Sequence, residues 1–188
     1  MSDVNTFHVY GGQLIDIANP TDEMIDIETI AHALSQMCRF GGHTNQFYSV
    51  AQHSVCVSLL CDPENALKGL LHDAPEAYIG DVIRPMQLHI NPRFAVLDAA
   101  WQEAIRRKFE LPGSLMTDDV KHADNGMLRY EAERLLSPPA VGDPWWEHLP
   151  ELKVDKPWMN RFTFWSPTEA KYQFLKRFAT LTAGPLTT

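Results

Sequence analysis

Four residues with ionisable side chains lie within ten positions at the end of an apolar run. His72 and Asp73 are adjacent, Glu76 follows His72 by four residues, and Asp81 comes five residues later. Side chains three or four residues apart share one face of a helix, so His72, Asp73 and Glu76 can point toward a common centre. A carboxylate that is buried without a partner is costly, and a bound cation removes that cost. The spacing therefore predicts a metal site.

Two further residues join His72 and Asp73 as candidate ligands. His53 and Asp124 lie in separate segments with helical spacing, so these four residues supply two imidazoles and two carboxylates from three predicted helices. A single histidine on a helix is more often a packed or solvated residue than a ligand, but four candidates together favour a site. Mixed nitrogen and oxygen ligands suit Zn²⁺, Mn²⁺, Co²⁺, Fe²⁺ or Mg²⁺, and they exclude a thiolate site.

The elements that must position these residues are predicted to be helices. Apolar stripes and capping residues predict helices over residues 27–38, 50–61, 64–73, 94–109 and 117–136. The first is expected to end near Gly41-Gly42, the third to bend or break at Pro75, and Arg84-Pro85 to open a linker. Residues 7–17 predict a short β-hairpin around Gly11-Gly12. The predicted fold class is an all-α bundle with a small N-terminal hairpin.

Residues 137–167 differ in composition from this core. They contain six prolines and four of the five tryptophans of the chain, which predicts an irregular, aromatic-rich arm with a short strand at 161–165. Two interpretations stay open: the arm is a lid or brace over the core, or it forms a subunit interface. Ser166-Pro167-Thr168-Glu169 is a capping box, which predicts a last helix over 168–182.

The bulk composition is typical of one soluble domain, expected over residues 1–188 with its core at 26–136. Of the 188 residues, 45% are hydrophobic and 21% are charged, which is enough to bury a core without staples. The net charge of −8 argues against a nucleic-acid polymer as partner. The three cysteines form no CxxC pair, and the chain has neither a signal peptide nor an apolar run of membrane length. We therefore expect a cytoplasmic protein that does not contact a membrane.

The order of the candidate ligands resembles that of the HD-domain phosphohydrolases, in which a His precedes an adjacent His-Asp pair and a distant Asp. His53, His72-Asp73 and Asp124 occupy those places. The resemblance narrows to the branch of the bacterial 5′-deoxynucleotidases and phage dATP triphosphohydrolases. It covers about residues 26–136 and rests on these segments: Arg39-Phe40, Tyr-Ser-Val-Ala-Gln-His at 48–53, His-Asp-Ala-Pro-Glu-Ala-Tyr-Ile-Gly-Asp at 72–81 and Lys-His-Ala-Asp at 121–124.

The resemblance implies roles for the residues around the metal. Arg39 is expected to bind a phosphate, and Phe40, where the family often has Trp, to pack on the deoxyribose so that a 2′-hydroxyl would clash. Gly42 is expected beside the purine, where a bulkier side chain would reject a 2-amino group. Gln52 stands where Glu is common, which removes a charge near the metal. Three more residues are candidate contacts to phosphate or base: His43, Arg84 and Lys121.

The implied chemistry is hydrolysis of a small deoxynucleotide. The expected cofactor is Zn²⁺, Co²⁺ or Mn²⁺, with additional Mg²⁺ carried by a triphosphate. Hydroxide would attack the α-phosphorus while Arg39 and Lys121 offset the developing charge. Glu76 is the candidate general acid or base, and Asp81 is expected to orient a partner or to recruit the second ion. The ligands of the first ion are the four residues of the set: His53, His72, Asp73 and Asp124.

Several functions are compared. The first is hydrolysis of dATP to deoxyadenosine and tripolyphosphate, and its close rival is hydrolysis of deoxynucleoside monophosphates. A second class is a regulator with a catalytically idle site, which would bind nucleotide without turnover and with an affinity that a chelator does not change. A third is a structural protein of a phage, which has support only from the aromatic arm. Because the branch forms dimers or rings of dimers, we expect a homo-oligomer, either a dimer or a hexamer. A phage-encoded enzyme would act in the host cytoplasm.

Overall fold

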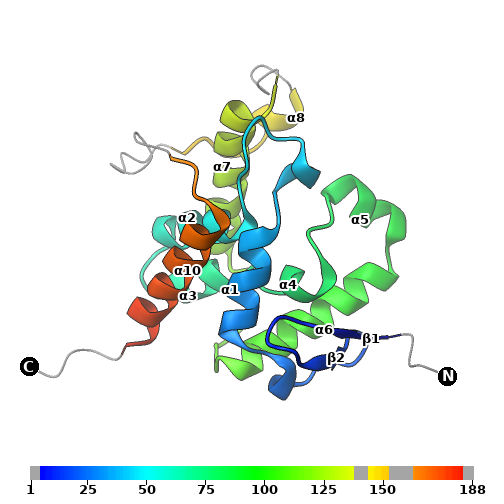
Figure 1. The fold of residues 1–188 in the computed structure, drawn as a ribbon. Coiled ribbons are helices and arrows are strands. Elements are labelled where there is room, and N and C mark those ends of the chain that lie inside the picture. The colour runs from blue at the N-terminus through cyan, green and yellow to red at the C-terminus, as the bar shows by residue number, and fades with distance from the viewer. Residues whose placement is uncertain (1–4, 138–143, 153–162, 184–188) are drawn as a thin grey trace, which may run out of the picture.

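The computed structural model of the chain describes residues 5–137, 144–152 and 163–183. The described part is mostly helical, with one two-stranded sheet (Figure 1). The elements in chain order are β1 (Thr6–His8), β2 (Leu14–Asp16), η1 (Asp22–Met24), α1 (Ile27–Gln36), η2 (Phe40–Gly42), α2 (Val50–Leu60), α3 (Ala66–Leu71), α4 (Glu76–Ile79), α5 (Arg84–Ile90), α6 (Arg93–Lys108), α7 (Asp118–Leu135), α8 (Pro144–Glu147) and α10 (Pro167–Thr182).

The predicted N-terminal hairpin is confirmed. Strands β1 and β2 pair antiparallel, with Phe7 opposite Ile15, and the two residues Gly11 and Gly12 turn the chain at φ values of 88° and 86°. Such positive φ values suit glycine, which lacks a Cβ atom. Ile15 is fully buried and Val9 packs against the same core cluster, so these two side chains anchor the hairpin to the core.

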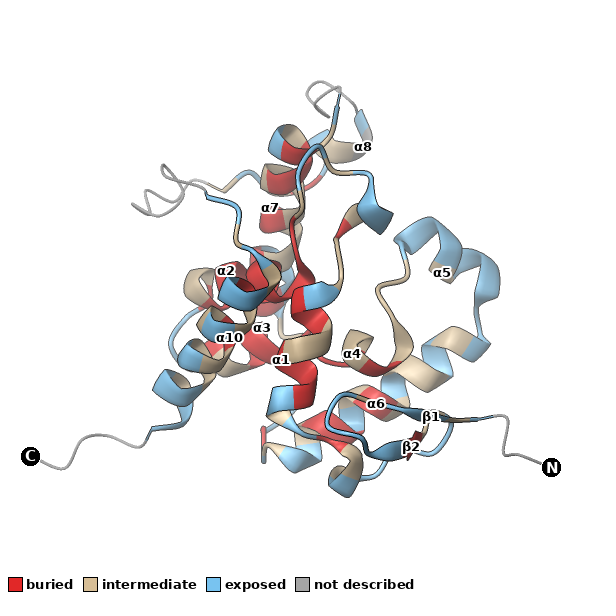
Figure 2. Cartoon of the chain, viewed as in Figure 1, coloured by how far each residue is buried: buried red, intermediate tan, exposed pale blue. Residues whose placement is uncertain are grey.

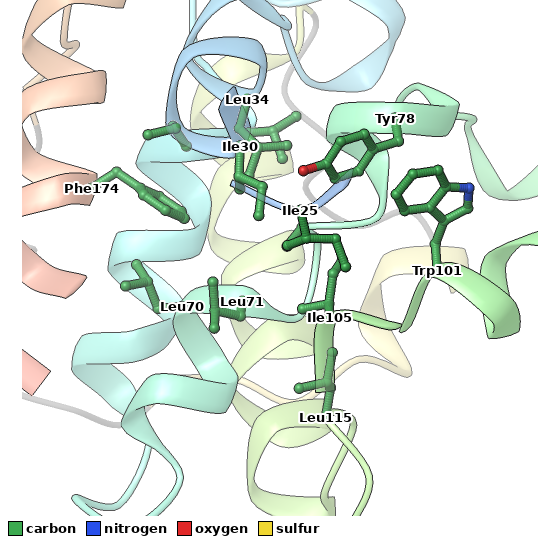
Figure 3. Packing of buried hydrophobic residues seen from close by; sticks show 14 of the residues in the cluster. Ile25, Ile30, Leu34, Leu70, Leu71, Tyr78, Trp101, Ile105, Leu115 and Phe174 are labelled. Carbon is green, nitrogen blue, oxygen red and sulfur yellow. The ribbon is translucent and has the colours of Figure 1, made fainter. Parts of the chain in front are cut away.

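Helix α2 forms the interior of the bundle. Nine of its eleven residues are buried, so neighbouring helices must cover it on all sides. It packs against α1, α3, α7 and α10. Figure 2 draws buried residues in red, and the outer helix α10 carries few of them. Figure 3 shows how the side chains of several elements meet in the main core, among them Ile30 of α1, Leu70 and Leu71 of α3, Ile105 of α6 and Phe174 of α10.

Four of the helices begin where the sequence places a capping residue. In each, the side chain at the N-cap accepts a hydrogen bond from a backbone N–H in the first turn, which satisfies one of the otherwise unpaired donors there. The predicted starts are therefore confirmed. The capping residues are Asp26 for α1, Ser49 for α2, Thr117 for α7 and Ser166 for α10.

The C-terminal end predicted for the first helix is wrong. Helix α1 ends at Gln36, well before Gly41-Gly42, because Cys38 instead forms an antiparallel bridge with Ser49. The Arg39 N–H then donates to the Tyr48 carbonyl at 2.9 Å. This pairing fixes the segment that carries Arg39 against the start of α2.

Helices α2 and α3 approach closely at Gly69. A Cβ atom on Gly69 would lie 2.7 Å from the Cys61 sulfur and 3.2 Å from the Cα of Ser58. Because Gly69 has no side chain, α2 and α3 can pack closely at this point. A larger residue would push the two helices apart. The end of α3, which carries His72, is held near the middle of α2, which carries His53.

Two prolines differ in their effects. Pro75 separates α3 from the short helix α4, as predicted. The linker predicted at Arg84-Pro85 is wrong, because these residues begin helix α5, where a proline in the first turn forfeits no intrahelical hydrogen bond. Helix α5 is largely exposed, as its blue colour in Figure 2 shows.

The predicted arm is only partly described. Residues 138–143 and 153–162 lie outside the described residues, and these include the first two positions of the strand predicted at 161–165. Residues 163–165 of that prediction are not assigned to a strand, and 144–147 form the short helix α8. The last helix, α10, is confirmed. Each helix in the described ranges is too short or too polar to cross a bilayer.

Candidate metal centre

Two histidines from different helices face each other in the interior. His53 lies on α2 and is fully buried, and His72 caps the C-terminus of α3 and is also buried. Their ring centroids are 5.3 Å apart, with the rings tilted by 51°. The close crossing of α2 and α3 at Gly69 therefore brings the imidazoles together.

The hydrogen bonds of each ring fix which nitrogen carries the proton. His72 Nδ1 lies 2.8 Å from the Gly69 carbonyl oxygen, which can only accept, so Nδ1 must be the donor. His53 Nδ1 lies 2.7 Å from Glu131 Oε1, a carboxylate oxygen that also only accepts, so Nδ1 is the donor in this ring too. In neutral rings, the Nε2 lone pairs are then free to bind a cation. Neither Nε2 atom has a hydrogen-bond partner within the described residues.

Two carboxylates complete this group. Asp73 has one oxygen 3.6 Å from His53 Nε2 and the other 3.2 Å from His72 Nε2. Asp124, from α7, has Oδ1 at 3.2 Å from His53 Nε2 and 3.9 Å from His72 Nε2. Three separate helical segments therefore bring the four predicted ligands together.

The group has the donor set and the spacing of a metal site. His53, His72 and Asp73 could hold an ion, since their ligand atoms all lie within 4.8 Å of one another. Two nitrogen or oxygen ligands on one tetrahedral Zn²⁺ are separated by about 3.4 Å, close to the separations seen here. Two buried lone pairs beside two carboxylates are unfavourable unless positive charge lies between them. The residues therefore fit a divalent ion.

The pKa values also indicate a site that attracts positive charge. Burial and Arg39 lower the pKa of His53, but Glu131 and Asp124 outweigh them and raise it to about 9. Burial also lowers the pKa of His72, but Asp73 and Asp124 outweigh this effect and raise the pKa above its ordinary value. Burial would raise the pKa of Asp124, yet the two imidazoles hold it well below its ordinary value.

A cavity of about 600 Å³ lies beside the metal group, within the size range of small-ligand sites. Arg39, Phe40 and His43 line it from η2 and the adjoining turn, and Asp73 and Asp124 form part of its wall. The remaining lining includes apolar residues of α7 and α8, among them Leu128 and Trp146, and polar residues of α5 and α6: Gln87, Asp98 and Gln102.

Arg39 and Phe40 lie at the junction between the metal group and this cavity. Arg39 is buried, with Nη1 at 3.5 Å from Asp73 and Nε donating to Glu131 at 3.1 Å. Phe40 adopts a positive φ of 56°, which is uncommon for a residue with a side chain. Its ring centroid lies 5.7 Å from the Arg39 guanidinium carbon and 6.3 Å from the Trp146 ring.

The carboxyl groups predicted for catalysis also line the cavity. Burial raises the pKa of Glu76 well above its ordinary value, and Asp73 and Asp81 add to this effect. Its Oε2 atom is buried and has no hydrogen-bond partner among the described residues. The pKa of Asp81 is raised too, chiefly by burial. Both groups lie where they can meet a ligand.

Two predicted substrate contacts lie elsewhere. Gly42 is exposed and is not part of the described cavity lining. Lys121 is also exposed and outside that lining, and its ammonium lies 3.7 Å from Asp118 in the first turn of α7. In contrast, Arg84 lines the cavity, donates to Asn125 at 3.0 Å and lies 3.8 Å from Asp124.

One residue of the site was not predicted from the sequence. Glu131 is fully buried and accepts hydrogen bonds from Arg39, Tyr48 and His53. It lies seven residues after Asp124, a spacing that returns to the same face of a helix. That spacing, in a helix with an otherwise apolar buried face, is the signal in the sequence that could have identified it.

Gln52 contacts the end of the arm. Its amide donates to the Thr163 carbonyl at 2.6 Å and accepts from the Trp165 N–H at 3.0 Å. A glutamine side chain can donate and accept at once, whereas an ionised glutamate can only accept. Glutamine at this position therefore suits the pairing with residues 163–165.

Gln52→Glu is expected to lower the free energy of unfolding by about 1–3 kcal/mol, since a buried acceptor would then face the Thr163 carbonyl. In a chain of this size that corresponds to several degrees in Tm, measured by thermal denaturation. Gln46→Glu, at an exposed position, is the matched control and is expected to leave Tm unchanged. Equal Tm values for the two variants would contradict the role of the Gln52 amide.

Two similar proteins were found by sequence comparison. The chain is 41% identical to "Uncharacterized protein YfdR" of Escherichia coli K12 over 138 residues, which are 72% of this chain and 73% of that protein. It is 37% identical to "Uncharacterized protein RCAP_rcc00048" of Rhodobacter capsulatus over 136 residues, 66% of this chain and 69% of that protein. No protein-family model matches the chain. At these levels of identity and coverage, the chain belongs to one family with YfdR and RCAP_rcc00048.

Proposed function

We propose that this protein is a metal-dependent phosphohydrolase of deoxynucleotides, with a site of the HD-domain kind. The observation that carries the proposal is that Asp73 and Asp124 each have an oxygen within 3.9 Å of the Nε2 atoms of both His53 and His72, beside a buried arginine and a cavity. A divalent ion bound there would acidify water and polarise a phosphoryl oxygen. Zn²⁺, Co²⁺ and Mn²⁺ suit this mixture of imidazole and carboxylate ligands.

The residues of the chain supply the remaining steps. Arg39 presents a planar, permanently charged fork at the cavity wall, suited to phosphate oxygens and to the charge that develops on them. Glu76, with its buried unpartnered oxygen, is the candidate to move the proton between water and the departing O5′. Asp81 lies close enough to influence Glu76 and is the candidate to orient it or to hold a second ion.

The number of phosphates distinguishes two candidate substrates. The resemblance to the phage enzymes favours dATP, hydrolysed to deoxyadenosine and tripolyphosphate. The charges of the cavity favour a deoxynucleoside monophosphate, because the described lining holds two arginines, Arg39 and Arg84, among five carboxyl groups. A triphosphate brings about two more negative charges than a monophosphate. Lys121 would have to leave Asp118 to offset them.

The test is a substrate panel with product identification. The protein, supplied in turn with Co²⁺, Mn²⁺, Zn²⁺ and Mg²⁺, is incubated with dAMP and dATP, and the products are separated by chromatography. Inorganic phosphate from dAMP identifies the monophosphatase, and tripolyphosphate from dATP identifies the triphosphohydrolase. The other three deoxynucleotides and 2-aminoadenine nucleotides measure base selection. Absence of turnover with every metal, together with nucleotide binding that a chelator does not change, would support the idle-site regulator instead.

Phe40→Ala is expected to raise activity on the ribonucleotide relative to the deoxynucleotide, because the ring beside Arg39 would no longer exclude a 2′-hydroxyl. The measurement is the ratio of kcat/KM for the two sugars with the same base and the same number of phosphates. Phe7→Ala, on the exposed strand β1, is the control and should leave the ratio unchanged. An unchanged ratio in Phe40→Ala itself would contradict the proposal that the Phe40 ring excludes ribonucleotides.

We also propose a homo-oligomer, a dimer or a hexamer, on the basis of the resemblance. Light scattering coupled to gel filtration measures the mass of the particle directly. A monomer at micromolar concentration would contradict it without affecting the assignment of the metal site, because the four ligands all come from one chain.

A further inference from the structure

Glu131 lies at the junction of three elements of the site. It is fully buried on α7, and no part of its side chain reaches solvent. Its Oε1 atom accepts from the Tyr48 hydroxyl at 2.8 Å and from His53 Nδ1 at 2.7 Å, and its Oε2 atom accepts from Arg39 Nε at 3.1 Å. Every described partner of this carboxylate is therefore a donor.

The carboxylate is ionised in this setting. It forms a buried ion pair with Arg39, whose Nε lies 3.1 Å from Glu131 Oε2. A buried ionised carboxylate is stable only when its oxygens are well supplied with donors, as here. Removing the charge would leave Arg39 and His53 buried without the partner that they share.

Two of the three donors are the residues that would meet the metal and the substrate. His53 turns Nδ1 toward Glu131, which directs Nε2 toward Asp73 and Asp124. Arg39 turns Nε toward Glu131, which leaves Nη1 beside Asp73 at the cavity wall. The orientation of the imidazole and of the guanidinium fork thus depends on one carboxylate.

We infer that Glu131 is a positioning residue shared by the metal centre and the phosphate site, so that metal affinity and phosphate affinity are coupled through it. The inference rests on the proposed function in taking His53 as a ligand and Arg39 as the phosphate contact. Glu131 lies behind both residues and acts through them.

A glutamine cannot replace this carboxylate in either of its orientations. With the amide oxygen toward His53 and Tyr48, the NH₂ group faces the Arg39 N–H, so that two donors oppose each other. With the amide reversed, the NH₂ group faces His53 Nδ1, which must then accept. The proton of a neutral ring would move to Nε2 and block the metal lone pair. Each orientation therefore damages one of the two sites.

The experiment compares Glu131→Gln with two control variants. Glu133→Gln changes a half-buried glutamate of the same helix that pairs with Arg129. Tyr48→Phe removes one donor and leaves the Arg39 and His53 contacts in place. Co²⁺ affinity is measured from the visible absorption of the bound ion, and the affinity of the Co²⁺-loaded protein for inorganic phosphate is measured by calorimetry.

Glu131→Gln is expected to lose about 10–100-fold in Co²⁺ affinity, the usual effect of removing the partner of a ligand. The absorption spectrum is expected to change shape as well, because the ring orientation changes. Phosphate affinity is expected to fall at least tenfold even when Co²⁺ is saturating. Glu133→Gln is expected to keep both affinities, and Tyr48→Phe is expected to change each by less than Glu131→Gln does. Wild-type affinities and spectrum in a folded Glu131→Gln protein would overturn the inference.

A second measurement covers the case in which Glu131→Gln does not fold. Nuclear magnetic resonance of the Zn²⁺-loaded wild-type protein reports which ring nitrogen of His53 carries its proton. The inference requires a neutral ring with the proton on Nδ1 and slow exchange of that proton, and a proton on Nε2 would overturn it.

The outcome is separable from that of the proposed function. Metal and phosphate affinities are measured without turnover, so a protein that hydrolyses no nucleotide can still show the coupling. Conversely, an active deoxynucleotidase in which Glu131→Gln keeps both affinities would contradict this inference alone.

Discussion

Asp73→Ala is expected to abolish both metal binding and turnover. Asp73 is the one ligand candidate that has an oxygen within 3.6 Å of each imidazole, with Oδ2 near His53 and Oδ1 near His72. Removing a residue that hydrogen-bonds to a metal ligand lowers metal affinity about 10–100-fold, and removing the ligand itself is expected to lower it further. Metal content after dialysis and nucleotide hydrolysis at added metal are the two measurements.

The matched control for this loss is Asp118→Ala. Asp118 is an exposed acid in the first turn of α7, where it pairs with Lys121 outside the cavity lining. It is expected to leave metal content and activity unchanged, which separates loss of a ligand from loss of negative charge. Full activity of a metal-depleted Asp73→Ala protein would remove the metal mechanism. Circular dichroism verifies that the variant is folded.

The capping residues and the stripes of apolar residues predicted most of the helices because both signals are local. Ser49 caps α2 and Ser166 caps α10 through backbone groups three residues away, so neither depends on the rest of the fold. The end of α1 was not predictable in the same way. It is set by the pairing of Cys38 with Ser49, across a loop. Arg84-Pro85 was misread because a proline can begin a helix as well as break one.

The candidate ligands were predictable as a set, but their distances were not. Adjacency of His72 and Asp73 is a property of the sequence, whereas their approach to His53 depends on the close crossing at Gly69. Glu131 was missed because its role depends on Arg39, which is 92 residues earlier in the chain. A glutamate on a helix is usually solvated, and only tertiary packing reveals that this one is buried.

Lys121 differs from the candidate ligands, because its predicted contact with phosphate is not seen in the described cavity lining. The resemblance made it a candidate through the Lys-His-Ala-Asp segment at 121–124. The side chain instead lies in solvent near Asp118. Arg84, predicted as a secondary contact, lines the cavity because the unpredicted helix α5 presents it there. The positions of these cationic side chains therefore depend on tertiary structure, whereas the identity of the candidate metal ligands could be predicted from the sequence.

Arg39→Lys is expected to lower kcat/KM by about 10²–10³-fold, the range for loss of one preorganised donor to a developing anion. The guanidinium donates to Glu131 through Nε while Nη1 lies at the cavity wall, 3.5 Å from Asp73. A lysine ammonium is a single point on a flexible stem and cannot keep both positions at once. Because His53 keeps its hydrogen bond to Glu131, Co²⁺ affinity is expected to change by only a few-fold. Activity assays and Co²⁺ titration measure the two effects separately.

Arg107→Lys is the control for this substitution. Arg107 lies at the end of α6, pairs with Asp22 at 2.9 Å and is exposed, outside the cavity lining. Its replacement is expected to leave kcat/KM unchanged, because an exposed ion pair contributes little and has no contact with the site. If Arg39→Lys matched Arg107→Lys in kcat/KM on every nucleotide, Arg39 would be a structural partner of Glu131 alone. The phosphate would then have to be bound by Arg84 and the metal.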